Sequence, residues 1–305
     1  MVAKPERTGK PRAGPSGRSS RGRPAMRAGP GQGMLGGMDT AEYSPPDTAY
    51  HIARLRGEGE LLAGAAEGAG LDAPVPACPG WRVCELLKHL GYVHRWAAGY
   101  VREQHAGWVD RASEAEILAG GPEDDELLTW FREGHASLVR VLETADPDMT
   151  CWTFLEAPSP VAFWARRQAH ETAIHRLDAD QAAAGAGKAG GGPPFTPRFA
   201  VDGIDELIMG FVGRNAKRGS WDGPAGSLAI HAGDGAGAAA DWRVVAGQGH
   251  LAVARETGPA DCDVTGSAAD LYMLLWNRCG AGGVSIRGED GLLAGFRRHI
   301  AVTWG

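Results

Sequence analysis

The chain has 305 residues, of which 43% are hydrophobic and 22% are charged, as is typical of a globular protein in water. No apolar run reaches the roughly 18 residues that a membrane-spanning helix needs, so we expect no membrane segment. The net charge is −6, but residues 1–37 carry +7, so the remainder carries the difference, −13, and an acidic folded part argues against nucleic acid as a partner.

Residues 1–37 are rich in Gly, Pro, Arg and Ser and lack apolar periodicity, which predicts a disordered basic tail. Met38 stands just before the first patterned segment and is the natural start that we expect. The five cysteines are an odd number with no C-x-x-C spacing, which predicts reduced, mostly buried thiols in a cytoplasmic protein. They are Cys78, Cys84, Cys151, Cys262 and Cys279.

Four amphipathic segments follow, and each is long enough for several helical turns. They run from about Thr48 to Ala69, from just after the turn at Cys78–Trp81 to about His105, from about Glu123 to Thr144, and from about Pro160 to Ala184. Acidic residues in the first turn of the third segment and a proline at the start of the fourth suit helix N-termini. Together they predict an antiparallel four-helix bundle over residues 45–185.

A Gly- and Pro-rich linker, residues 186–194, then separates the bundle from a stretch of different pattern. Residues 195–305 predict a small α+β domain, because short strand-like runs alternate with helical segments. The expected helices lie near 199–217, 267–278 and 291–300, and the expected strands near 227–231, 242–246, 250–254 and 284–287.

The second helix carries an ionisable group within an apolar stripe. His89 shares one face with Leu86, Val93, Trp96 and Tyr100, so its ring points into the bundle. A buried imidazole needs hydrogen-bond partners, and taken alone this pattern favours a core histidine that is satisfied by a carbonyl.

The fourth helix carries Glu171 and His175, which are four residues apart and therefore share a face, with Trp164 and Asp178 on the same side. An isolated pair of this kind is typical of an exposed helix face. His170 and Glu171 suggest a zinc-protease motif, but His170 and His175 are five residues apart, about 140° around the helix, and cannot bind one ion together.

The two helices in combination favour a metal site. One His from the second helix and the Glu–His pair from the fourth offer three ligands inside a bundle, where such sites are common. Two His and one Glu leave a zinc ion with an open fourth position, which is the arrangement of a catalytic site. The sequence therefore predicts a Zn²⁺ or other divalent metal site at His89, Glu171 and His175.

These segments carry a family resemblance. Residues 75–81 (VPACPGW), 86–91 (LLKHLG) and 94–96 (HRW), together with 166–176 (RRQAHETAIHR), resemble the mycothiol-dependent maleylpyruvate isomerase family within the wider DinB-like superfamily, over about residues 47–184. The segments 264–271 and 275–278 are similar to that family's smaller, sterol-carrier-like C-terminal domain. The resemblance implies a DinB-like metal-binding bundle followed by this α+β domain.

The resemblance also implies zinc at the same three residues and mycothiol as the thiol cosubstrate. A basic residue of the C-terminal domain would hold an anionic substrate, and we expect Arg278 in this catalytic role, with Arg287 as its competitor. His94 and His170 are expected behind the ligands or on the surface. Because the thiol arrives with the cosubstrate, no cysteine is needed as a nucleophile, and Cys78 and Cys84 are expected near the site in sequence only.

The function implied is a zinc- and mycothiol-dependent isomerase, or a thiol S-transferase, that acts on a small electrophile such as maleylpyruvate. Its partners would be that electrophile and a low-molecular-weight thiol, in a monomer or a weak homodimer. Two alternatives stay open: a non-catalytic metal- and ligand-binding module, and a hydrolase that uses metal-bound water with a pKa near 7.

Overall fold

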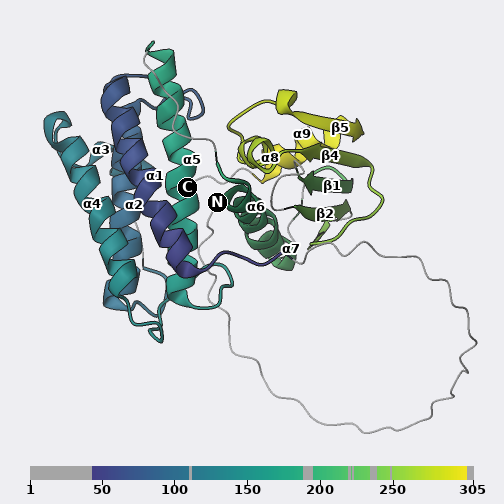
Figure 1. Ribbon diagram of the computed structural model, residues 1–305, viewed down its shortest axis with the longest axis horizontal. Helices are drawn as coiled ribbons and strands as arrows, with labels where there is room; N and C mark the ends of the chain where they lie inside the picture. The colour runs from purple at the N-terminus through teal and green to yellow at the C-terminus, as the bar shows by residue number, and fades with distance from the viewer. Residues whose placement is uncertain are drawn as a thin grey trace, which may run out of the picture.

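The computed structural model describes residues 43–109, 112–187, 195–218, 221, 223–233, 239–247 and 249–300. The predicted tail, residues 1–37, and residues 188–194 of the predicted linker lie outside this part of the chain. The first half is a bundle of long helices, and the second half is a five-stranded sheet with helices packed against it (Figure 1). The predicted fold class is therefore confirmed.

The bundle consists of four long helices: α1 (Thr48–Ala69), α2 (Val83–Glu103), α4 (Asp124–Thr144) and α5 (Pro160–Gly185). Asp47 accepts a hydrogen bond of 2.7 Å from the backbone N–H of Tyr50 at the start of α1, and Ser159 caps α5 just before its N-terminal proline. These bounds agree with the predicted ones to within about two residues. A short helix, α3 (Glu114–Ala119), lies between α2 and α4 and was not predicted.

The directions of the four helices follow from their contacts. On α2 and α4, residues 91–102 contact residues 130–137 in the same order along both helices, so these helices run parallel. Contacts of α1 with α5 also follow the same order, whereas those of α2 with α5 and of α1 with α4 follow the opposite order. The bundle is thus up-down-down-up, so the pairs α1–α5 and α2–α4 are parallel and depart from the antiparallel arrangement that the sequence predicts. The segments 104–109 and 112–123 lie between α2 and α4 in the chain.

The second half opens with one long helical stretch that changes its winding midway. It comprises α6 (Pro197–Asp205), a π-helical segment η1 (Glu206–Val212) and α7 (Gly213–Arg218). The sheet that follows has the strand order β3-β2-β1-β4-β5. Its strands are β1 (Gly226–Ala232), β2 (Ala240–Gly247), β3 (His250–Ala254), β4 (Cys262–Gly266) and β5 (Val284–Gly288).

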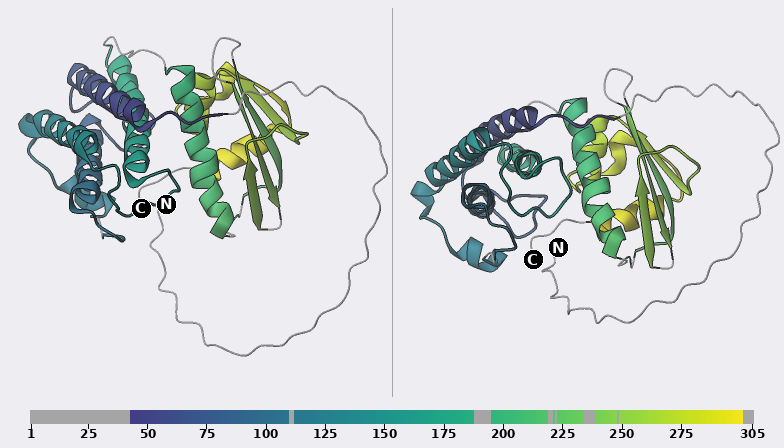
Figure 2. Two further views of the ribbon diagram at one scale, coloured as in Figure 1. Left: turned by 60° about the horizontal axis from the view of Figure 1, so that its bottom comes forward. Right: turned by 90° about the horizontal axis from the view of Figure 1, so that it is seen from below.

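All neighbouring strands are antiparallel except β1 and β4, which pair in parallel. Strand β4 was not predicted, although Cys262 and Val264 alternate with polar residues as a half-buried strand requires. Helices α8 (Ala268–Leu275) and α9 (Asp290–His299) complete this half. Figure 2 shows the α6–α7 stretch between the bundle and the sheet.

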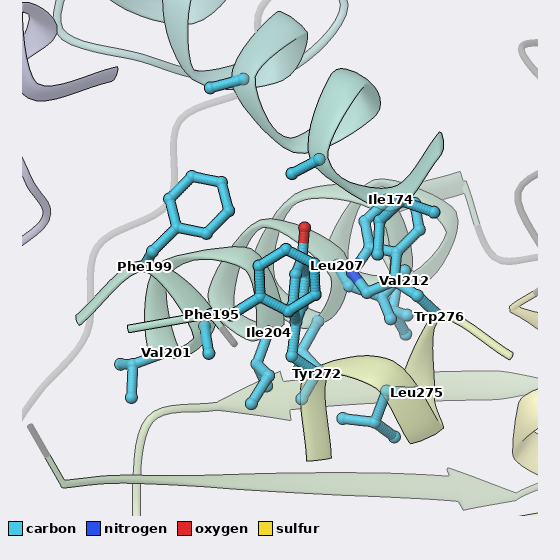
Figure 3. Close-up of a cluster of buried hydrophobic side chains, with 14 of the residues drawn as sticks. Ile174, Phe195, Phe199, Val201, Ile204, Leu207, Val212, Tyr272, Leu275 and Trp276 are labelled. Carbon is cyan, nitrogen blue, oxygen red and sulfur yellow. The ribbon is translucent and has the colours of Figure 1, made fainter. Parts of the chain in front are cut away.

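The helical bundle and the sheet-containing second half share one hydrophobic core where they meet. Ile174 of α5 belongs to the same buried cluster as Phe199 of α6 and Tyr272 of α8 (Figure 3). The indole N–H of Trp276 donates to the backbone carbonyl of Gly203 at 3.2 Å, which ties α8 to α6. Helix α6 therefore packs against α5 on one side and α8 on the other. The division of the chain at residues 186–194 remains a prediction.

The cysteines are all free, as expected. Cys84 and Cys262 are fully buried, while Cys78, Cys151 and Cys279 are only partly buried, so the expectation of mostly buried thiols is met at two positions. Among the described helices, none combines the length with the apolar composition that membrane crossing requires.

Candidate metal centre

Helices α2 and α5 bring the three predicted metal ligands together. Oε1 of Glu171 lies 3.5 Å from Nε2 of His89 and 3.6 Å from Nε2 of His175. The three ligand atoms all lie within 4.8 Å of one another. The residues are buried, with 1%, 4% and 7% of His89, Glu171 and His175 exposed. Two imidazole nitrogens and one carboxylate oxygen therefore face a common point.

Helical periodicity explains this convergence. Glu171 and His175 are one turn apart on α5, and α2 runs antiparallel to α5, so that His89 lies opposite the pair. Trp81, in the turn before α2, covers the two histidines, with ring centroids 5.1 Å from His89 and 6.5 Å from His175. The turn motif that precedes α2 thus supplies an apolar wall for the site.

The carboxylate of Glu171 is held by a buried arginine that also pairs with a second carboxylate. Arg167, one turn earlier on α5, donates to Oε2 of Glu171 at 2.8 Å and also bonds the carboxylate of Glu206 at the start of η1. Burial alone would raise the pKa of Glu171, but its polar contacts with His175 and His89 and the charge of Arg167 hold that pKa well below its ordinary value. Glu171 is therefore ionised, and its Oε1 faces the histidines.

His175 is oriented by a carboxylate behind it. Its Nδ1 lies 2.9 Å from Oδ2 of Asp178, and the guanidinium of Arg278 donates to both oxygens of Asp178, from Nε at 2.7 Å and from a terminal nitrogen at 2.9 Å. Burial would raise the pKa of Asp178, but these partners lower it. An ionised carboxylate only accepts, so Nδ1 of His175 carries a proton, and in the neutral ring Nε2 would keep the lone pair that a metal needs.

The two arginines proposed for substrate binding lie in different places. Arg278 is mostly buried at the edge of the site, where it is engaged with Asp178 and with the carbonyl of Trp276. Arg287 is exposed on β5, the edge strand of the sheet. Only Arg278 touches the surroundings of the ligands, and its catalytic role remains a prediction.

Three further expectations need correction or refinement. Cys78 is near the site in space as well as in sequence, since its Sγ lies 3.7 Å from Oδ2 of Asp178. Cys84 instead belongs to the apolar core of the bundle. His94 and His170 are both fully buried, which excludes a surface position for either. His94 bonds the hydroxyl of Thr172 at 2.9 Å on the interior side of the bundle.

His170 belongs to a second cluster, at the junction of α1, α5 and α6. Nε2 of His51 and of His170 lie 2.8 and 2.7 Å from Oδ2 of Asp202. Nε of Arg166 donates to the same oxygen at 3.1 Å, and Tyr43 donates to Oδ1 at 2.6 Å. Both oxygens of Asp202 are thus occupied by N–H and O–H donors, one of them a cation. This set is a hydrogen-bonded joint between the two halves, and we assign no metal to it.

Two comparisons relate the chain to known proteins. The model of the mycothiol maleylpyruvate isomerase N-terminal domain matches residues 38–180, and that of the corresponding C-terminal domain matches residues 198–295. The chain belongs to the mycothiol maleylpyruvate isomerase family. Since the family is named for an enzyme, the predictions of the family and of an enzyme of this family are confirmed.

Two solved structures share the fold of this family member. Both are crystal structures of the mycothiol-dependent maleylpyruvate isomerase, one of them a histidine-to-alanine mutant. They match with TM-scores of 0.54 and 0.55 at 15% identity, and each match covers 79% of this chain and 94% of the other. A search of the curated proteins finds no significant match. At this identity the structures support the fold, and the roles of individual residues rest on the geometry above.

Residues missed in the sequence also shape the site. Arg167 and Glu206 fix the carboxylate of Glu171, and Trp81 covers the histidines. Arg167 precedes Glu171 by one helical turn, so pairing at this spacing could have revealed it. Glu206 left no comparable signal, because its contact with α5 depends on how the two halves pack.

Proposed function

We propose that this chain is a zinc-dependent and mycothiol-dependent isomerase or thiol S-transferase that acts on a small, maleylpyruvate-like electrophile. The observation that carries the proposal is the spacing of the ligand atoms. Separations of 3.5 and 3.6 Å from Oε1 of Glu171 exceed the usual length of a hydrogen bond between nitrogen and oxygen. Zinc bonds of about 2.0–2.1 Å in a tetrahedron place neighbouring ligand atoms about 3.3–3.4 Å apart, close to these values.

The donor set and its surroundings fit a zinc ion with one exchangeable position. His89, Glu171 and His175 supply three protein ligands, and catalytic zinc sites keep a fourth position open. The proton on Nδ1 of His175 leaves Nε2 free for the metal. Arg167 bonds Oε2 of Glu171 and the carboxylate of Glu206. The other oxygen of Glu171, Oε1, is therefore directed at the two histidines.

A bound zinc would supply a Lewis acid that favours the thiolate form of a thiol in the open position. This matters because a free thiol has a pKa near 8.5, so only a few per cent is thiolate at neutral pH. The residues of the chain orient the ligands, exclude water on the side of Trp81, and keep Glu171 ionised.

The thiol then adds to an electrophilic carbon of the substrate. In the isomerase reaction the thiol adds to one carbon of a cis double bond, which leaves a single bond that can rotate. After rotation the same thiol leaves and the double bond re-forms, so no atom is gained or lost. In the transferase reaction the thiol stays attached and a leaving group departs with its electron pair. Both reactions need the same first step, which is the step that this site would assist.

Metal analysis of the purified protein tests the site. We expect about one zinc per chain in the wild type, loss of zinc in His175→Ala, and retention in His51→Ala, which removes a buried His of the junction cluster instead. A wild type without zinc, or a His175→Ala variant with full occupancy, would contradict the proposed site.

Turnover of maleylpyruvate then tests the chemistry. We expect it to require both zinc and mycothiol. Activity with zinc alone would favour the hydrolase, and zinc binding without any turnover across electrophiles would favour the binding module. Either result would replace the proposed function.

A further inference from the structure

One ion pair connects the C-terminal half of the chain to a proposed metal ligand on α5. Arg278 follows α8, and Asp178 lies three residues after His175. Their contact joins residues that are 100 positions apart in the sequence. From Arg278 the contacts continue through Asp178 to Nδ1 of His175, and Nε2 of the same ring faces Glu171. The C-terminal half therefore contacts His175 indirectly, through the carboxylate of Asp178.

The backbone after α8 is shaped to make this contact. Asn277 has a φ of 61°, in the left-handed region that Asn tolerates better than most residues, and it ends the helix. The chain turns back, so that the N–H of Arg278 bonds the carbonyl of Met273 at 2.8 Å. Gln181 of α5 donates to the carbonyl of Arg278 at 3.0 Å, which holds the residue against α5. The arginine is thus fixed at both its backbone and its guanidinium.

The guanidinium has a partner on each of its nitrogens. Nε and one terminal nitrogen bond Asp178, and the other terminal nitrogen bonds the carbonyl of Trp276 at 2.9 Å. A fork of this kind fixes the plane of the carboxylate as well as its charge. Asp178 is itself fully buried, so its orientation depends on the groups that bond it, and this arginine bonds both of its oxygens.

We propose that Arg278 and Asp178 are positioning residues through which the C-terminal half sets the metal affinity of the bundle, by fixing the tautomer and orientation of His175. This inference rests on the proposed metal site. Carboxylates behind ligating histidines commonly act in this way, and their loss costs about 10- to 100-fold in metal affinity. The role differs from direct contact with the substrate, because it is exerted before any substrate binds.

The zinc affinity of the substrate-free protein tests this role, measured by competition with a chromophoric chelator. We expect Arg278→Met and Asp178→Asn each to weaken zinc binding by about 10- to 100-fold. Asn can donate to Nδ1 as well as accept from it, so it no longer selects the tautomer that leaves Nε2 free. Arg278→Lys keeps the charge but loses the fork, and we expect a smaller loss.

A matched control is available in the same half of the chain. Arg255 makes an equivalent fork with Asp205, at 2.6 and 2.9 Å, but reaches no proposed metal ligand. Arg255→Met should leave the zinc affinity unchanged. The absorption spectrum of the cobalt-substituted protein should shift in Asp178→Asn and stay constant in Arg255→Met, because it reports the geometry of the ligands.

The outcomes separate this inference from the site itself. A wild type that binds no zinc overturns the proposed function. A wild type that binds zinc, with Arg278→Met and Asp178→Asn matching it in both affinity and cobalt spectrum, overturns only the positioning role and leaves Arg278 to contact the substrate. If Arg278→Met fails to fold, the nearly isosteric Asp178→Asn decides the question by the same two measurements.

Discussion

Arg167 is the residue whose removal should change the stability of the protein most clearly. It lies fully buried between the carboxylates of Glu171 and Glu206, which are themselves buried. Breaking a buried ion pair by deleting one partner costs about 3–5 kcal/mol, because the remaining charge is left without compensation. In Arg167→Met two such charges remain. We therefore expect the metal-free protein to lose at least about 3 kcal/mol of its free energy of unfolding.

The aromatic rings beside Arg167 add to this loss. Its guanidinium lies 5.3 Å from the ring centroid of Phe211 and 5.2 Å from that of Trp276. Cation–π contacts of this kind contribute about 0.5–2 kcal/mol. Methionine fills part of the volume but carries no charge. The ionic and aromatic terms therefore act in the same direction.

Zinc should reverse part of the loss, because a divalent cation on Glu171 replaces the missing positive charge. Urea denaturation with and without zinc measures both effects, and the variant should gain more from zinc than the wild type does. In Arg167→Met with Glu206→Gln only one buried charge remains, so the double variant should recover part of the stability. A metal-free Arg167→Met protein within about 1 kcal/mol of the wild type would refute the reasoning.

Two further predictions concern stability. A Cβ at Gly203 would lie 2.2 Å from the ring of Tyr272, so Gly203→Ala should cost about 1–3 kcal/mol in urea denaturation, whereas Gly64→Ala, with open space around it on α1, should not destabilise the protein. Burial holds the pKa of His94 well below its ordinary value and also lowers that of His135. At these two positions the unfolded chain binds protons below about pH 6.5 that the folded chain does not, so His94 and His135 lower the stability as the pH drops from 7 to 5, whereas the raised pKa of His175 acts in the opposite direction. His94→Gln should weaken this dependence in metal-free protein, and an unchanged slope would contradict it.

The sequence predicted that His89, Glu171 and His175 come together because helical periodicity is a local property. The four-residue spacing of Glu171 and His175 places both on one face whatever surrounds α5. The apolar stripe around His89 likewise indicates which face of α2 is buried. Neither argument depends on knowing which helices are neighbours. In the structure Glu171 and His175 do share a face, and His89 is buried.

Other features could not be predicted from local pattern. The parallel course of α2 and α4 depends on how the connection between them returns along the bundle, and nothing in the periodicity of either helix indicates this. Strand β4 is five residues long, too short for its alternation to stand out. The extent of the helix at 197–218 was predicted, but its π-helical turn at Glu206 was not.

The environment of His175 shows where local reasoning ends. Asp178 shares a face with His175, and the sequence revealed this, but a carboxylate at that position could equally bond water. In the structure Asp178 bonds Arg278, which reaches it because Asn277 turns the chain after α8 and α6 packs between α8 and α5. The same arginine was expected to bind substrate because the family resemblance implies a basic residue of the C-terminal domain in that role. The partner of Arg278 depends on how the two halves pack, so no helical pattern in the sequence connects this arginine to Asp178 and, through it, to His175.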